Sequence, residues 1–192
     1  MEPASNDNVF RDWRPKEWFD SGFLNCVPDK ERVAFVRKVR PLTDVLAKVV
    51  ESTLFAGIAH PLHPRKTSGW VKRLFEDNKR LGMGATKSSD VIKAISEQIN
   101  WPDSDVILMA YYHQGVYALQ WKTFIDYFKR DFLNLDNPIV FHPKRREALL
   151  FWEDDHRPCL GSRRDGTIMD VPWPPPEIPW NSAKTSTDAG AT

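Results

Sequence analysis

The chain has 192 residues, with 27 basic and 26 acidic side chains that leave a formal net charge of +1. This length suits one domain with a core of its own, and it is too short for two domains of ordinary size. A near-neutral charge excludes the strong field that draws a whole protein to nucleic acid or to an anionic membrane. We therefore do not expect nucleic acid as the partner.

Three features bear on cellular location. The first residues, MEPASNDNVFRDW, are polar and acidic, and they lack the basic start and apolar run of a signal peptide. No stretch contains the ~18 consecutive apolar residues of a membrane span, so we expect no membrane partner. Cys26 and Cys159 lie far apart in the chain, which predicts two reduced thiols and no disulfide framework. Together these features predict a cytoplasmic protein.

Apolar residues spaced by three and four predict helices in the first part of the chain. Residues 29–59 contain two such stretches, and Pro41 should separate a short helix from a longer one that starts near Thr43. The prolines of residues 60–69 then predict a loop. The longer helix takes its helical spacing from Leu42, Val45, Leu46, Val49 and Val50.

Two further helices are expected over residues 67–82 and 88–101, because their apolar residues share one helical face. The connecting stretch GMGATKSS contains glycines and a lysine, but it lacks the glycine that directly precedes the lysine of a phosphate-binding loop. We therefore expect a connection between two helices, in which Ser88 or Ser89 caps the second.

The pattern changes midway along the chain, where β-branched and aromatic residues become frequent. Residues 105–121 predict a β-hairpin, with Gly115 supplying the positive φ of a tight turn. Helical spacing returns over 122–133, residues 137–152 predict two strands across the charged turn PKRR, and 158–164 predict a last strand. This order predicts an α+β fold, in which N-terminal helices precede an antiparallel sheet with one inserted helix.

The composition changes again near Asp165. We expect a single α+β domain over residues 1–165 and an extended tail over 166–192, rich in proline and tryptophan and ending in a disordered segment. Trp173 and Trp180 would be unusual in a free linker, which favours a strap that lays both indoles on the domain. The alternative is a docking peptide for an aromatic groove of another protein.

The stretch EDDHR, residues 153–157, places three acidic residues and a histidine directly after an apolar run. A metal site needs ligands that converge from different elements, whereas consecutive residues of a turn diverge into solvent. We therefore interpret Glu153 to His156 as a charged turn between two strands, with an exposed recognition site as the alternative. The histidines of HPLHPRK, residues 60–66, are flanked by prolines that oppose a helix, so no metal site is predicted there.

A small basic edge is expected if the predicted strands pair in sequence. It would combine Lys144, Arg145 and Arg146 with Arg163 and Arg164. Such an edge usually guards strand ends and keeps the protein in solution, and the alternative is a contact with phosphate or with an acidic partner.

Residues 105–164 combine a hairpin, a Trp-x-x-Phe helix (Trp121 and Phe124), a proline-bounded charged turn between two strands, and a closing Gly-x-Arg (Gly161 and Arg163). This pattern resembles the carboxyl half of a loosely defined group of uncharacterised bacterial domains. Some domains of this build are immunity proteins, which neutralise a toxin delivered by neighbouring cells. The resemblance bears on fold more than on function, and it implies no active-site residue.

Two functions remain. The first is a non-enzymatic, cytosolic protein-binding domain, for which the resemblance favours a bacterial immunity or antitoxin protein that neutralises a toxin by direct binding. The second is a hydrolase or nucleic-acid-processing enzyme that pairs His113, His142 or His156 with a carboxylate. No motif has catalytic spacing, which favours the binding domain, and we predict no catalytic residue, metal or cofactor.

A binding domain needs aromatic anchors and some charge at its surface. The sequence concentrates both in the predicted hairpins. The predicted partner-binding residues are Tyr111, Tyr112, His113, Tyr117, Trp152, Glu153, Asp154, Asp155, His156 and Arg157.

Overall fold

The computed structural model describes the two main parts of the fold, an antiparallel sheet and the helices that cover it. The described residues are 9–14, 22–55, 75–85, 87–111, 114–133, 138–152, 155–163, 169, 171 and 173. No helix among them is long and apolar enough to cross a bilayer.

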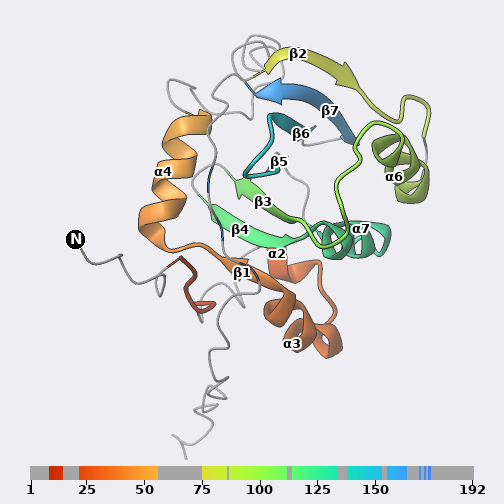
Figure 1. Ribbon diagram of the computed structural model, residues 1–192. Helices are drawn as coiled ribbons and strands as arrows, with labels where there is room; N and C mark the ends of the chain where they lie inside the picture. The colour runs from red at the N-terminus through yellow and green to blue at the C-terminus, as the bar shows by residue number, and fades with distance from the viewer. Residues whose placement is uncertain are drawn as a thin grey trace, which may run out of the picture.

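Seven strands form one antiparallel sheet in the order β1-β4-β3-β5-β6-β7-β2 (Figure 1). The strands are β1 (Val39–Pro41), β2 (Phe75–Arg80), β3 (Val106–Tyr111), β4 (Gly115–Gln120), β5 (Ile139–Phe141), β6 (Glu147–Trp152) and β7 (Asp155–Arg163). The helices are α2 (Gly22–Asn25), α3 (Asp29–Lys38), α4 (Asp44–Phe55), α6 (Ser88–Ser96) and α7 (Trp121–Lys129). The predicted α+β fold with an antiparallel sheet is confirmed, and α7 is the helix expected between the β3–β4 hairpin and the later strands.

Both faces of the sheet are buried. Helices α3, α6 and α7 cover one face, where Ile107, Met109 and Tyr111 of β3 belong to the larger hydrophobic cluster. Helix α4 lies on the other face, where Leu108 and Ala110 belong to the second cluster (Figure 1). Because successive side chains of a strand point to opposite faces, a strand buried on both sides needs an unbroken apolar sequence, and VILMAY has one.

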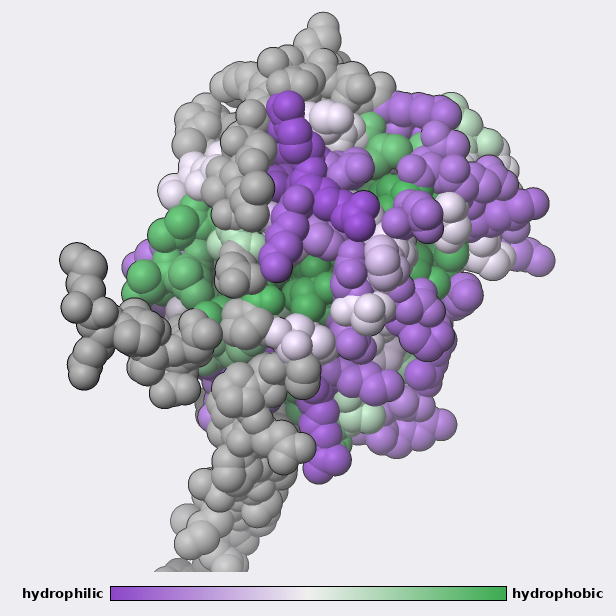
Figure 2. Space-filling model, in the orientation of Figure 1, coloured by the Kyte–Doolittle hydropathy of each residue, from purple (hydrophilic) through white to green (hydrophobic). Residues whose placement is uncertain are grey.

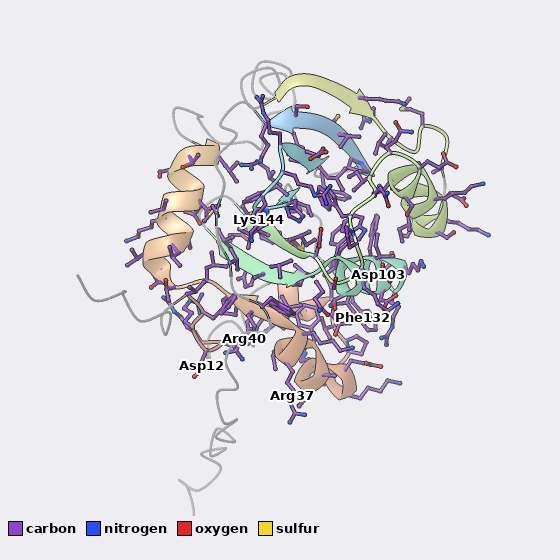
Figure 3. The ribbon with its side chains drawn as sticks, viewed as in Figure 1. Asp12, Arg37, Arg40, Asp103, Phe132 and Lys144 are labelled. Carbon is purple, nitrogen blue, oxygen red and sulfur yellow. The ribbon has the colours of Figure 1, made fainter. Side chains whose placement is uncertain are left out.

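A short N-terminal segment, residues 9–14, lies along β1. The backbone N–H of Arg11 donates to the carbonyl of Pro41 (3.0 Å), and Arg40 forms an ion pair with Asp12 (3.5 Å; Figure 3). Pro41 therefore lies in β1, the strand at one edge of the sheet, where a missing backbone N–H does not interrupt a central ladder. The sequence predicted the helices on both sides of Pro41, but not this short strand between them.

The helix expected over residues 67–82 is wrong for the described part of that stretch, because Phe75–Arg80 form strand β2 and pair with β7. Three apolar residues at helical spacing gave only a weak local signal. On the side away from β6, the long strand β7 presents a row of backbone N–H and C=O groups, and pairing with β2 satisfies those that face it. Tertiary pairing therefore overrides the local pattern here.

The connection GMGATKSS joins strand β2 to α6, so the expected link between two helices is also wrong. Residue Lys87 occupies the N-cap position of α6, and neither serine caps the helix with its side chain. The Ser88 hydroxyl instead donates to the carboxylate of Asp131 (2.7 Å), just beyond the end of α7. This bond ties α6 to α7 on the same side of the sheet.

Candidate binding surface

Two hairpin turns that carry most of the predicted partner-binding residues lie at the same end of the sheet. Ala110, near the end of β3, pairs with Ile139, which pairs with Leu150, near the end of β6. Only β5 separates these strands, so their ends lie about 10 Å apart. The end of β3, which Tyr112 and His113 follow in the sequence, therefore lies close to the end of β6, which Glu153 and Asp154 follow. We call this end of the sheet the turn end.

The first turn has the predicted construction. Strands β3 and β4 pair in register from Val106–Gln120 to Tyr111–Gly115, and Gly115 has a φ of 106°, which strongly favours glycine. The hairpin and the role of its glycine are therefore confirmed. Tyr112 and His113 lie outside the described residues, so their part in binding stays a prediction.

The second turn is shorter than predicted. Trp152 pairs with Asp155, so β7 begins at Asp155 and includes His156 and Arg157. The expectation of a charged turn through His156 is wrong at this point, because the strand pairing begins as soon as the chain has reversed. The side chains of residues 152–157 lie outside the described part of the structure, and their part in binding stays a prediction.

Two of the predicted anchors are core residues. Tyr111 and Tyr117 are each 3% exposed, and their rings pack edge to face with centroids 5.9 Å apart. Tyr117 also stacks on Trp13 (5.3 Å) and donates a hydrogen bond to the carbonyl of Gln114 (3.2 Å). In this conformation the two tyrosines support the β3–β4 hairpin from inside and present almost no surface to a partner.

Helix α4 is joined directly to the turn end. The Glu51 carboxylate accepts a hydrogen bond from the backbone N–H of Gly115 (3.2 Å), the first residue of β4. This contact fixes the carboxyl half of α4 beside the β3–β4 turn. No sequence pattern predicted this contact, because Glu51 and Gly115 lie in different predicted elements.

The outer face of α4 is apolar where a surface helix is usually polar. Val45 is 74% exposed and Val49 is 52% exposed, and residues four apart lie on the same helical face. On the next turn, the hydroxyls of Ser52 and Thr53 both donate to the carbonyl of Val49 (2.9 Å each), so they are satisfied within the helix. We call Val45, Val49, Ser52 and Thr53 the α4 surface.

Figure 2 shows hydrophobic surface on the side of the molecule where α4 lies. The sequence contained a signal for it. One helical stripe cannot bury Val45, Leu46, Val49 and Val50 together, and the structure buries Val50, half-buries Leu46 and exposes the other two. Hydrophobic side chains exposed on consecutive turns are a feature of helix faces that contact another protein.

The opposite end of the sheet carries a polar cluster built around His142. This residue follows β5, and its ring lies against the ring of Trp101 (5.6 Å between centroids). The ring Nε2 lies 3.0 Å from Oδ2 of Asp105, and Nδ1 accepts the backbone N–H of Lys144 (3.0 Å). Because Nδ1 is an acceptor, Nε2 carries the proton and donates to Asp105.

This arrangement favours the neutral imidazole. Burial lowers the pKa of His142 below its usual value, and the hydrogen bond to Asp105 opposes that shift. A proton on Nδ1 would also face the N–H of Lys144, so protonation must break that bond. In the neutral form both ring nitrogens are engaged inside the protein, and neither is left to accept a proton from a substrate.

The predicted basic edge forms at this end, but its arginines bond chiefly to the backbone. Arg146 Nε and Nη2 both donate to the carbonyl of Arg163 (3.1 and 3.0 Å), and Arg163 Nη2 donates to the carbonyl of Arg145 (3.0 Å). The Arg163 guanidinium is buried and lies over the ring of Phe141 (4.7 Å). Arg145 reaches Asp105 (3.7 Å). Arg164 lies outside the described residues.

The arginines therefore close the β5–β6 turn onto the end of β7. Within the part of the chain that the structure describes, no three histidine, cysteine, aspartate or glutamate side chains are grouped to hold a metal ion. The HPLHPRK histidines lie outside that part.

One piece of the tail contacts the domain. Trp173 packs edge to face on Phe10 (6.1 Å between centroids), and Met169, Val171 and Trp173 lie against the second hydrophobic cluster. The backbone N–H of Met169 donates to the carbonyl of Pro143 (2.9 Å). These contacts agree with the expected strap as far as Trp173. Trp180 lies outside the described residues.

No family model, curated protein or solved structure matches this chain.

Proposed function

We propose that this chain is a non-enzymatic protein-binding domain, and that its binding surface combines the turn end of the sheet with the α4 surface. The partner we propose is a toxin that the domain neutralises by direct binding, as a bacterial immunity protein does. The toxin class rests on the sequence resemblance alone. The location of the surface rests on the geometry.

The observation that carries the proposal is the strand register at the turn end. It brings together two segments that are about forty residues apart in the sequence and that hold most of the predicted partner-binding residues. Glu51 then links α4, with its exposed valines, to the same place. Apolar side chains beside charged turns match an interface with an apolar centre and a polar rim.

A second function is kept because the same register favours it. His113 follows β3 by two residues in the sequence and His156 is the second residue of β7, and the end of β3 and the start of β7 both lie at the turn end. Glu153 and Asp154 precede β7 in the sequence. A histidine paired with a carboxylate there would suit a hydrolase or a nucleic-acid-processing enzyme. His142 does not suit that role, because its ring nitrogens are already bonded.

The test uses Val49→Lys in the full chain, with Val33→Lys as the matched control. Val33 lies on α3 and is 45% exposed, which is close to Val49. A partner captured from the native host with the wild-type chain is purified, and its binding kinetics are measured with each variant. We expect Val49→Lys to speed dissociation roughly 30-fold, about 2 kcal/mol, because a buried charge replaces an apolar anchor.

The control should bind as the wild type does. Equal binding by both variants would refute the α4 surface. If no partner is captured, and the chain turns over a nucleotide or nucleic-acid substrate with activity lost in His113→Ala or His156→Ala, the enzyme replaces the binding domain. Circular dichroism of each variant checks that its fold is intact.

A further inference from the structure

Strand β2 forms one outer edge of the sheet (Figure 1). It pairs with β7 on one side, and no strand that the structure describes lies on its other side. Asn78, Lys79 and Arg80 stand opposite Gly161, Leu160 and Cys159 of β7.

The direction of the β2 backbone follows from one hydrogen bond. The N–H of Leu81 donates to the carbonyl of Pro158 on β7 (2.9 Å). In an antiparallel ladder, alternate residues of a strand bond to the same neighbour. Leu81 and Lys79 therefore direct their backbone groups toward β7, and Asn78 and Arg80 direct theirs toward the open side.

The sequence of this edge has a symmetry of charge. Glu76 and Asp77 precede Asn78, and Lys79 and Arg80 follow it. A second copy of the strand, placed antiparallel with the two-fold axis at Asn78, would set position 76 opposite 80 and position 77 opposite 79. Acidic residues would then stand opposite basic residues at all four of these positions.

The backbone and the charges select the same register. Two strands bond only where the backbone groups of both residues of a pair point toward each other. Asn78 must therefore pair with a residue whose backbone groups also point away from β7 of its own copy. Asn78 opposite Asn78 meets that condition. Moving the axis by one residue, to position 77 or 79, would set Asp opposite Asp or Lys opposite Lys. A parallel pair in register would set like charges together throughout.

We propose that two copies of this chain associate through β2, edge to edge and antiparallel, with Asn78 on the two-fold axis and the sheet continuous across both copies. A bulge in the β2–β7 pairing lies between Phe75 and Asn78, so the ladder sets the backbone direction of residues 78–80 only. The charges that favour the register lie at positions 76, 77, 79 and 80. Charged edges usually prevent edge-to-edge pairing. Here the charges oppose the other registers and favour this one.

One short strand from each copy makes a small interface, below the ~1,200 Å² that stable complexes usually bury. We therefore expect a weak dimer whose population rises with protein concentration. Lys79 and Arg80 are exposed, so 1 M salt, with a Debye length of about 3 Å, should screen their ion pairs and weaken the dimer.

The decisive test uses two complementary charge variants. Lys79→Glu with Arg80→Glu makes the edge wholly acidic, and Glu76→Lys with Asp77→Lys makes it wholly basic. Sedimentation velocity at rising concentration should show a dimer for the wild type, a monomer for each variant alone, and a dimer again for their equimolar mixture. A wild type that stays monomeric at millimolar concentration and low salt, or a variant that dimerises alone as the wild type does, would overturn the proposal.

A backbone test separates strand pairing from simple charge attraction. Asn78→Pro removes an N–H on the open side and keeps all four charges, so it should lose the dimer and keep the fold. Lys79→Pro removes an N–H that faces β7, so it should lower the melting temperature. If Asn78→Pro is folded by circular dichroism and still dimerises like the wild type, the pairing through β2 is wrong.

Discussion

At the scale of single residues, the neighbours of His142 decide whether it can act as a catalytic base. The sequence offered it as a candidate base, since a lone histidine near charged residues allows catalysis. The structure joins it to Asp105, 37 residues earlier, and to the backbone of Lys144. Nothing in the sequence links His142 to Asp105, because they lie on opposite sides of the β3–β4 hairpin and α7.

This environment makes the stability of the fold depend on pH. The pKa of His142 is lowered in the folded chain from its ordinary value of 6.5, so the unfolded chain binds the proton more readily. The free energy of unfolding should therefore fall as the pH falls below about 6.5, and this loss should be complete below the folded pKa. Above about 6.5 the residue is neutral in both states and adds no pH dependence.

Denaturant unfolding between pH 4 and pH 8 measures this slope. His142→Gln removes the titrating group, so the slope of the variant below about pH 6.5 should be shallower than that of the wild type, by up to about 1.4 kcal/mol per pH unit. Other groups titrate in both chains, so the difference between the two unfolding free energies at each pH reports the titration of His142. Parallel curves would contradict the assignment of a neutral, buried His142.

At the scale of elements, the sequence predicted the helices and strands whose spacing of apolar residues matches the face that each element buries. The β3–β4 hairpin combines apolar runs with a turn glycine, and α7 buries Trp121, Phe124 and Phe128 on one face. The elements it missed are held by distant partners. Polar β2 is a strand because β7 lies beside it, and β1 is a strand because β4 does. The only sequence signal for the exposed valines of α4 is that the helix has more apolar residues than one helical stripe can bury.

The tail offers a test of an element that lacks regular structure. Ending the chain before Asp170 removes Val171 and Trp173, which lie against the second hydrophobic cluster and Phe10. Their loss should lower the free energy of unfolding by on the order of 2 kcal/mol and the melting temperature by several degrees. Thermal unfolding followed by circular dichroism measures the shift.

The control ends the chain after Trp180 and deletes the small, polar residues 181–192, which should leave the melting temperature unchanged. An unchanged melting temperature in the shorter chain as well would make the tail a docking peptide. That outcome would add a second candidate contact to the molecule.

At the scale of the whole molecule, the fold separates its surfaces. Both faces of the central strands are buried, so contacts with a partner fall to the helices, the strand ends and the β2 edge, on whose outer side no described strand lies. The basic residues of the β5–β6 turn lie at one end of the sheet, and β6 ends at the other, where the acidic residues Glu153 and Asp154 follow it in the sequence. The formal net charge of +1 does not reveal this division, because it sums 27 basic and 26 acidic residues over the whole chain.

This separation predicts how the turn end meets a basic partner. Charge at the rim of an interface mainly speeds association, while apolar anchors at its centre mainly slow dissociation. Replacing Asp154 and Asp155 with lysine should therefore slow association with a basic partner several-fold at low salt, with little change in dissociation. The same change at Asp103 and Asp126, exposed carboxylates near the other end, serves as the control, because it alters the net charge equally and leaves the turn end intact. Stopped-flow or surface-based kinetics at two salt concentrations separates the effects. Equal slowing by both pairs would show that the partner responds to net charge alone and would remove the turn end from the binding surface.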